Sequence, residues 1–211
     1  MQPHATNRPH QRRRETGFRS LVRHIHEYDE IASIGEIARR YFAMNAFDGV
    51  LTIIGVLMGN LTAGVRDARI VVTTGLATCV AMGVSGFWGA YLTESAERRR
   101  DLSELSRQTL TDLNDTRIGR ASRSAAITVS VVDGLSPFVA ALIVLIPFFA
   151  AGALPSVVWA YYVSLGFALV TLFGLGLFLG YTSKEHIVPY GIKTVVAGIA
   201  SIAISLLIGA H

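Results

Sequence analysis

The sequence predicts an all-α membrane protein with five transmembrane helices. Of the 211 residues, 51% are hydrophobic and only 16% are charged, unlike the balance of a soluble domain. Residues 134–183 contain no Asp, Glu, Lys or Arg, which leaves room for two spans of about 20 residues each. The stretch AAGALPS at 150–156 separates these two spans, because glycine and proline interrupt helices. The predicted spans are 41–64, 69–92, 124–150, 156–181 and 187–209.

The polar segments complete the predicted organisation. Residues 1–17 are rich in Arg, His, Pro and Gln and predict a disordered basic tail. Residues 18–40 carry apolar side chains at helical spacing, which predicts an amphipathic cytoplasmic or interfacial helix. Neither segment contains the apolar core of a signal peptide, so we expect the first span to direct insertion. Helices 1 and 2 then occupy 41–92, a cytoplasmic helical connection with acidic and basic residues occupies 93–123, and helices 3 to 5 occupy 124–211.

The basic residues predict the orientation in the membrane. Of the 19 Lys and Arg, all but Arg66 and Arg69 precede span 1, lie between spans 2 and 3, or flank the connection between spans 4 and 5. Because cytoplasmic loops are enriched in Lys and Arg, we expect the N-terminus in the cytoplasm and His211 outside, with the protein in the plasma membrane. The net charge of +4 follows from this topology and from anionic lipid, and it does not indicate a nucleic-acid partner.

Asp48 lies within an otherwise apolar stretch of the first span, MNAFDGVLTIIGVLMGN. A charged side chain at the bilayer centre costs about 2.5–3.5 kcal/mol, so it normally faces a protein interior or a water-filled path. Helical spacing places Met44, Asn45 and Thr52 on the same face as Asp48. This mixture of oxygen and sulfur donors suits a first-row divalent metal better than Mg²⁺ or Ca²⁺. The alternative is a structural carboxylate that forms a hydrogen bond with a neighbouring helix.

Other features of the spans extend this candidate path. In the second span, Met82 offers a thioether toward a neighbouring helix. In the third span, Asp133 is followed by glycine, as Asp48 is, and we expect Asp133 to be either a proton site or a structural partner. Glycines at helical spacing predict close helix packing. They are Gly55, Gly59, Gly83, Gly86 and Gly89.

The connection 93–123 carries acidic residues at steps of three and four. If the second span continues into the cytoplasm as a helix, these residues line one face. They are Glu94, Glu97, Asp101 and Glu104. Two interpretations remain open: a solvated helix whose acids pair with nearby arginines, or a surface that collects metal at the cytoplasmic mouth together with Glu36 and Glu30.

The sequence does not indicate an enzyme. It contains no His-Glu-x-x-His, no Gly-x-Ser-x-Gly and no P-loop motif. All six histidines lie outside the predicted spans, so no intramembrane histidine cluster is available for zinc or haem. We therefore expect no permanently bound cofactor.

Over about residues 36–209, the chain resembles the vacuolar iron transporter family. The resemblance rests on residues 45–52 (NAFDGVLT), on Ser85, Gly89 and Tyr91, on 145–148 (LIPF), and on Gly198 with 207–209. It implies five spans, a cytoplasmic N-terminus and a homodimer with a path between the two copies of span 1. It also implies export of Fe²⁺ or Mn²⁺ from the cytoplasm in exchange for protons. Co²⁺ and Zn²⁺ are further candidate cargoes.

Two positions depart from the pattern Ser-Met-Ala-x-Gly-Glu-Tyr that family members usually carry late in span 2. Gly86 stands where methionine is expected, and Ala90 stands where glutamate is expected. These departures remove two ligands from the set that the resemblance implies. Met82 lies one turn before Gly86 on the same face and would compensate for the missing thioether.

The resulting hypothesis is a homodimeric exporter of divalent transition metal with Asp48 as the central ligand and proton-exchange group, aided by Met44, Asn45 and Met82. Binding of a cation to a carboxylate displaces its proton, so one group can serve both roles. An alternative is a non-transporting membrane metal sensor or scaffold that binds a partner through the acidic helix. A third interpretation is a carrier of another cation or small solute.

Overall fold

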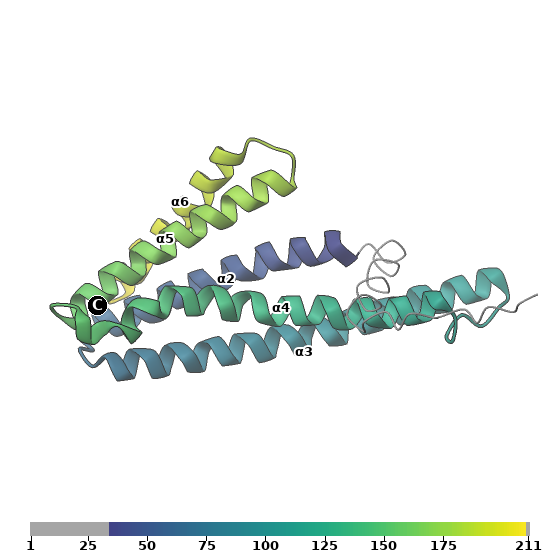
Figure 1. Cartoon of the computed structure of the whole chain (residues 1–211), viewed down its shortest axis with the longest axis horizontal. Helices are drawn as coiled ribbons and strands as arrows, with labels where there is room; N and C mark the ends of the chain where they lie inside the picture. Colours follow the sequence, from purple (N-terminus) through teal and green to yellow (C-terminus); the bar gives the residue numbers. More distant parts are fainter. Residues whose placement is uncertain (1–33, 210–211) are drawn as a thin grey trace, which may run out of the picture.

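The protein folds into five long helices in a computed structural model that describes residues 34–209. The helices are α2 (Ile34–Thr62), α3 (Ala68–Thr109), α4 (Arg117–Phe149), α5 (Val157–Thr182) and α6 (Ile187–Gly209), with a 3-10 turn, η1 (Ala151–Ala153), after α4 (Figure 1). All five are long and apolar enough to cross a membrane, which confirms the predicted all-α fold with five spans. The predicted tail 1–17 and most of the predicted amphipathic helix 18–40 lie outside the described residues.

Local sequence signals mark where α3 and α4 begin. The carboxylate of Asp67 caps α3 by accepting a hydrogen bond from the backbone N–H of Arg69 at 2.8 Å. The hydroxyl of Thr116 caps α4 in the same way. Gly64, in the turn before α3, has a φ of +75°, a left-handed conformation that glycine adopts without steric cost.

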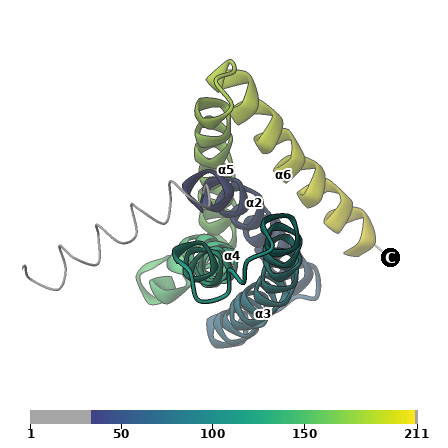
Figure 2. The same ribbon diagram turned by 90° about the vertical axis from the view of Figure 1, so that its right-hand side faces the viewer.

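Figures 1 and 2 show two helix pairs that diverge from each other. α3 and α4 form a long antiparallel hairpin, and its arginine-rich end projects beyond the start of α2. α5 and α6 form the other pair. α2 lies between the pairs and contacts each of the other four long helices. α3 is an unbroken helix of 42 residues, so most of the predicted connection 93–123 is helical.

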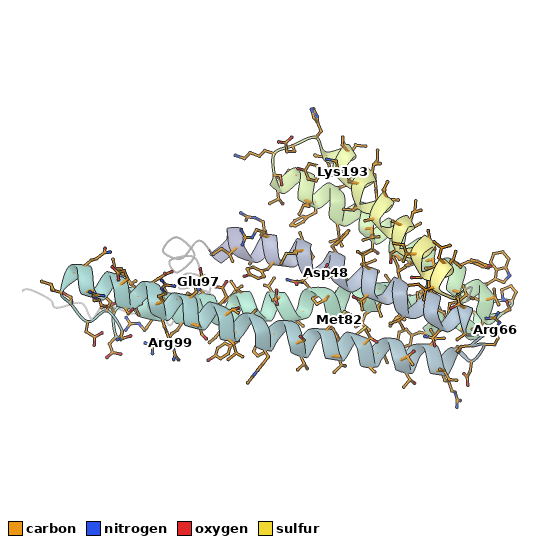
Figure 3. All side chains as sticks on the ribbon, turned by 180° about the vertical axis from the view of Figure 1, so that it is seen from behind. Asp48, Arg66, Met82, Glu97, Arg99 and Lys193 are labelled. Carbon is orange, nitrogen blue, oxygen red and sulfur yellow. The ribbon has the colours of Figure 1, made fainter. Side chains whose placement is uncertain are left out.

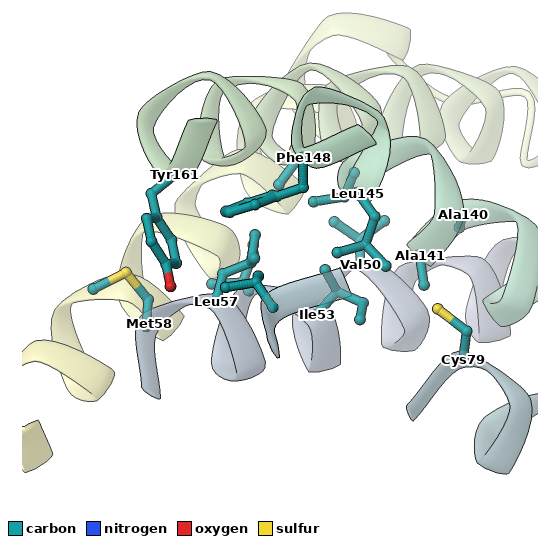
Figure 4. Close-up of a cluster of buried hydrophobic side chains, with 14 of the residues drawn as sticks. Val50, Ile53, Leu57, Met58, Cys79, Ala140, Ala141, Leu145, Phe148 and Tyr161 are labelled. Atoms are coloured by element: carbon teal, nitrogen blue, oxygen red, sulfur yellow. The ribbon is translucent and has the colours of Figure 1, made fainter. Parts of the chain in front are cut away.

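The buried core lies where α2, α4 and α5 meet (Figure 4). Ile53, Leu57 and Leu145 are fully buried there. The ring of Tyr161 packs edge-on against Phe148, with 4.9 Å between centroids. Because lipid tails are as apolar as these side chains, close packing and hydrogen bonds hold the helices together more than the hydrophobic effect does.

Glycines allow the three helices around Asp48 to approach each other closely. A Cβ atom on Gly49 of α2 would lie 2.6 Å from both the Cα and the carbonyl oxygen of Pro137 in α4. A Cβ atom on Gly134 of α4 would lie 2.6 Å from the carbonyl oxygen of Gly83 in α3. Real Cβ atoms do not approach other atoms so closely, so only glycine fits at these two crossings.

Candidate metal path beside Asp48

A recess of about 380 Å³ lies between α2, α3 and α4 at the level of Asp48. It combines a carboxylate, an amide, two hydroxyls and a thioether with small or rigid residues. Its lining consists of Asn45, Asp48, Thr52, Ala81, Met82, Ser85, Gly86 and Pro137. The structure thus brings four predicted path residues from two helices to one recess, and Figure 3 shows Asp48 on α2 and Met82 on α3 near each other.

Asp48 also belongs to an uncovered face of α2. Exposed residues recur along this helix at steps of four and three, which places them on one side. They are Met44, Asp48, Thr52, Gly55 and Gly59. Cβ atoms on Gly55 and Gly59 would meet no atom within 4 Å, so these predicted packing glycines face open space in the described chain. The side chain of Met44 points outward on this face, is 53% exposed, and does not line the recess.

Asp133 does not line the recess but is connected to it through Asn45. The Asp133 side chain is buried, and its carboxylate accepts a hydrogen bond from the Asn45 amide. The same amide nitrogen donates to the backbone carbonyl of Tyr41 at 2.8 Å. Asn45 therefore links the recess wall on α2 to a buried acid on α4.

Gly86 and Pro137 contribute to the lining of the recess from α3 and α4. A Cβ atom on Gly86 would lie 3.0 Å from the carbonyl oxygen of Asp133 and 3.2 Å from its carboxylate Oδ2. A side chain at this position, such as the methionine that the family resemblance implies, would require the neighbouring atoms of α4 to shift by a few tenths of an ångström. Pro137 lacks an N–H group, so the Asp133 carbonyl, four residues earlier, has no α-helical donor.

Sequence reasoning did not identify Ser85 and Pro137 as site residues. Ser85 entered only as part of the family resemblance, and its position three residues after Met82 could have placed it on the same face. A proline inside an apolar span is a known signal of freed backbone carbonyls in membrane proteins. That signal could have drawn attention to Pro137.

The predicted acidic face of α3 does not gather into one cluster. Glu94 is buried, accepts a hydrogen bond from Arg98 Nε at 3.0 Å, and accepts another from the Tyr41 hydroxyl at 3.3 Å. Glu97, Asp101 and Glu104 are exposed. Within residues 34–209, no three His, Cys, Asp or Glu side chains lie close enough together to hold a metal ion. Glu30 and the side chain of Glu36 lie outside the described part of the chain.

The predicted packing glycines of α3 have different surroundings. Gly83 and Gly86 lie against the backbone of α4, where their lack of a side chain permits the close crossing. A Cβ atom on Gly89 would meet no atom within 4 Å. Gly83 and Gly86 are three residues apart, so this close approach of the two backbones spans about one turn of α3, and Gly89 does not take part in it.

Two comparisons with known proteins bear on this site. The model of the VIT family matches residues 40–117, which include Asp48, Met82 and Glu94. An uncharacterized protein of Methanocaldococcus jannaschii is 31% identical over 173 residues, which cover 81% of this chain and 87% of the archaeal protein.

Proposed function

This chain belongs to the VIT family of membrane metal-ion transporters, and we propose that it exports Fe²⁺ or Mn²⁺ from the cytoplasm across the plasma membrane in exchange for protons. The observation that carries the proposal is the recess beside Asp48, where a carboxylate, an amide, hydroxyls and a thioether line one space between helices. Oxygen and sulfur donors together favour first-row divalent metals over Mg²⁺ and Ca²⁺. Co²⁺ and Zn²⁺ accept the same donors and are further candidate cargoes.

Asp48 is the central residue of the proposed mechanism. Its carboxylate is exposed at the recess and makes no hydrogen bond or ion pair with another described side chain, so it is available to an entering cation. A metal ligand must be deprotonated, so metal binding at Asp48 releases any proton that the carboxylate holds. When the metal leaves on the outer side, a proton can bind to Asp48 again. Metal export and proton import are thereby coupled.

The uncovered face of α2 supports a homodimer with the path between the two copies of this helix. A carboxylate in contact with lipid is costly, so the face that carries Asp48 needs protein or water against it. Gly55 and Gly59 on the same face allow a second backbone to come close. In such a dimer, Met44 of each copy would face the shared path and add its thioether to the donors of the recess, which already include Thr52.

Flux measurements in proteoliposomes test this proposal. The vesicles contain one dye for divalent metal and one for pH, and we compare wild type with Asp48→Asn for Fe²⁺, Mn²⁺, Co²⁺ and Zn²⁺. Asp67→Asn is the matched control, because it removes the same charge at an exposed loop while asparagine retains the helix cap. We expect Asp48→Asn to abolish metal flux and its proton signal, and Asp67→Asn to retain both. Full flux in Asp48→Asn would contradict the role of this carboxylate.

A membrane metal sensor or scaffold is a second candidate function. It is favoured by the two missing family ligands at Gly86 and Ala90, and by the engagement of Glu94 with Arg98 instead of an open metal site. Absence of flux from wild-type protein that is folded and dimeric would support this function over transport. A sensor would still bind metal at Asp48, which equilibrium binding to the purified protein would detect.

A further inference from the structure

Two recesses follow each other along one face of the α3–α4 hairpin. The first is an apolar groove of about 400 Å³ between Val80, Val84 and Phe87 of α3 and Val131, Leu135 and Phe138 of α4. The second is a basic recess of about 430 Å³, whose lining includes Tyr91, Ser95, Arg98 and Arg99 of α3 and Ser122 and Arg123 of α4. Neither recess shares a lining residue with the recess at Asp48.

The apolar groove and the basic recess form one continuous surface. The α3 residues that line them recur at helical intervals, so they lie on one side of the helix. They are Val80, Val84, Phe87, Tyr91 and Arg98. The rings of Phe87 and Tyr91 are nearly parallel at 4°, with 6.4 Å between centroids, and they join the two parts. A long amphiphilic molecule could therefore lie along both parts at once.

The basic recess presents two arginines without acidic partners. Arg98 is neutralised by Glu94 at 3.0 Å. Arg123 donates from Nη2 to the backbone carbonyl of Asn114 at 2.8 Å, which holds its guanidinium at the recess. Among residues 34–209, no carboxylate pairs with Arg99 or Arg123. Together they leave an excess of positive charge for a bound anion.

The change from apolar to basic lining falls at the predicted membrane surface. The second span is predicted to end at residue 92 and the third to begin at residue 124, so the apolar groove lies at the depth of acyl chains. The arginines lie just beyond, at the depth of lipid phosphates. Guanidinium groups bind phosphate through paired hydrogen bonds, and basic pockets between helices on the cytoplasmic side suit anionic headgroups.

We propose that this surface binds one anionic phospholipid, with its headgroup phosphate on Arg99 and Arg123 and an acyl chain along the apolar groove. A free phosphate would use only the basic recess, and a neutral lipid would use only the apolar groove. If one molecule occupies both the apolar groove and the basic recess, the surface should prefer lipids that have an acidic headgroup and a long chain. This site is separate from the metal path, so it does not rest on the proposed transport function.

Native mass spectrometry of the detergent-purified protein tests the proposal by titration with phosphatidylglycerol, phosphatidylcholine of the same chains, or inorganic phosphate. The variant Arg99→Gln/Arg123→Gln removes the two proposed phosphate ligands. Arg100→Gln/Arg120→Gln is the matched control, because both arginines lie outside the recess and Arg120 also donates to a backbone carbonyl, at 2.8 Å. We expect the first variant to bind phosphatidylglycerol roughly tenfold more weakly, and the control to bind it as wild type does.

A second variant tests the acyl-chain part. Val84→Phe/Val131→Phe fills the apolar groove at two exposed positions, so the fold is retained. We expect it to weaken phosphatidylglycerol binding but not phosphate binding. Three results would each overturn the proposal. Wild type could bind phosphatidylglycerol and phosphatidylcholine with equal affinity, or the two arginine variants could lose the same amount of phosphatidylglycerol affinity. The third is unchanged phosphatidylglycerol binding by Val84→Phe/Val131→Phe. The proposal would also be overturned if Val84→Phe/Val131→Phe changed the monomer–dimer ratio without changing lipid binding, because a second copy of the chain would then occupy this surface.

Discussion

Gly49→Ala tests the close crossing of α2 and α4 that positions Asp48. The added Cβ would lie 2.6 Å from the Cα and the carbonyl oxygen of Pro137 and 2.9 Å from its carbonyl carbon. These are backbone atoms of a helix, so no side-chain rotation can relieve the overlap. The two helices must separate by most of an ångström to reach the 3.4 Å at which ordinary contact begins.

The expected cost follows from two opposing effects. Overpacking of a closely packed interior costs about 1–3 kcal/mol. The overlap here is with backbone atoms that cannot rotate away, so we take the upper value of about 3 kcal/mol. Alanine favours a helix over glycine by up to about 1 kcal/mol, which offsets part of this cost. We therefore expect Gly49→Ala to lower the free energy of unfolding by about 2 kcal/mol. Because the crossing also holds Asp48 at the recess, metal flux should fall as well.

The measurement is denaturant unfolding in detergent micelles, followed by the helical circular dichroism signal. Gly174→Ala on α5 is the matched control, because a Cβ at this position meets no atom within 4 Å. We expect the control to be as stable as wild type or slightly more stable. If Gly49→Ala were as stable as Gly174→Ala, α2 and α4 would not be closely packed at this crossing, and the reasoning would be refuted.

Three further predictions concern two side-chain hydrogen bonds and one ion pair. Tyr161→Phe removes the donor to the backbone carbonyl of Val65, at 3.1 Å, and should lower the free energy of unfolding in the same assay by about 1–3 kcal/mol. Asn45→Ala should lower the free energy of unfolding by about as much, because it leaves the buried carboxylate of Asp133 without its amide donor. In a double-mutant cycle with Asp133→Asn, the two losses of stability should not add. Full additivity would show that the pair does not interact. Glu94→Gln leaves Arg98 without its counter-charge and should lower the midpoint of thermal unfolding, while an unchanged midpoint would mean that this ion pair contributes little.

Much of the fold follows from local properties of the sequence. Hydropathy predicts five spans, because the bilayer sets the length of an apolar helix wherever that helix lies in the bundle. Helical spacing likewise predicts that Met44, Asp48 and Thr52 share a face, since the period of a helix is the same in any tertiary context. The sequence alone therefore determined the class of protein and the helix face that carries Asp48.

Only the tertiary structure decided which faces meet. Spacing shows which residues lie on the same side of a helix, but not which neighbour that side contacts. Asn45 and Asp133 are 88 residues apart, and no local pattern indicates that they form a hydrogen bond. The same reason explains why Gly86 lies against α4 while Gly55, equally small and also in a span, faces open space. The alignment of apolar and basic recesses along α3 and α4 likewise depends on how two helices with separate sequence patterns come together.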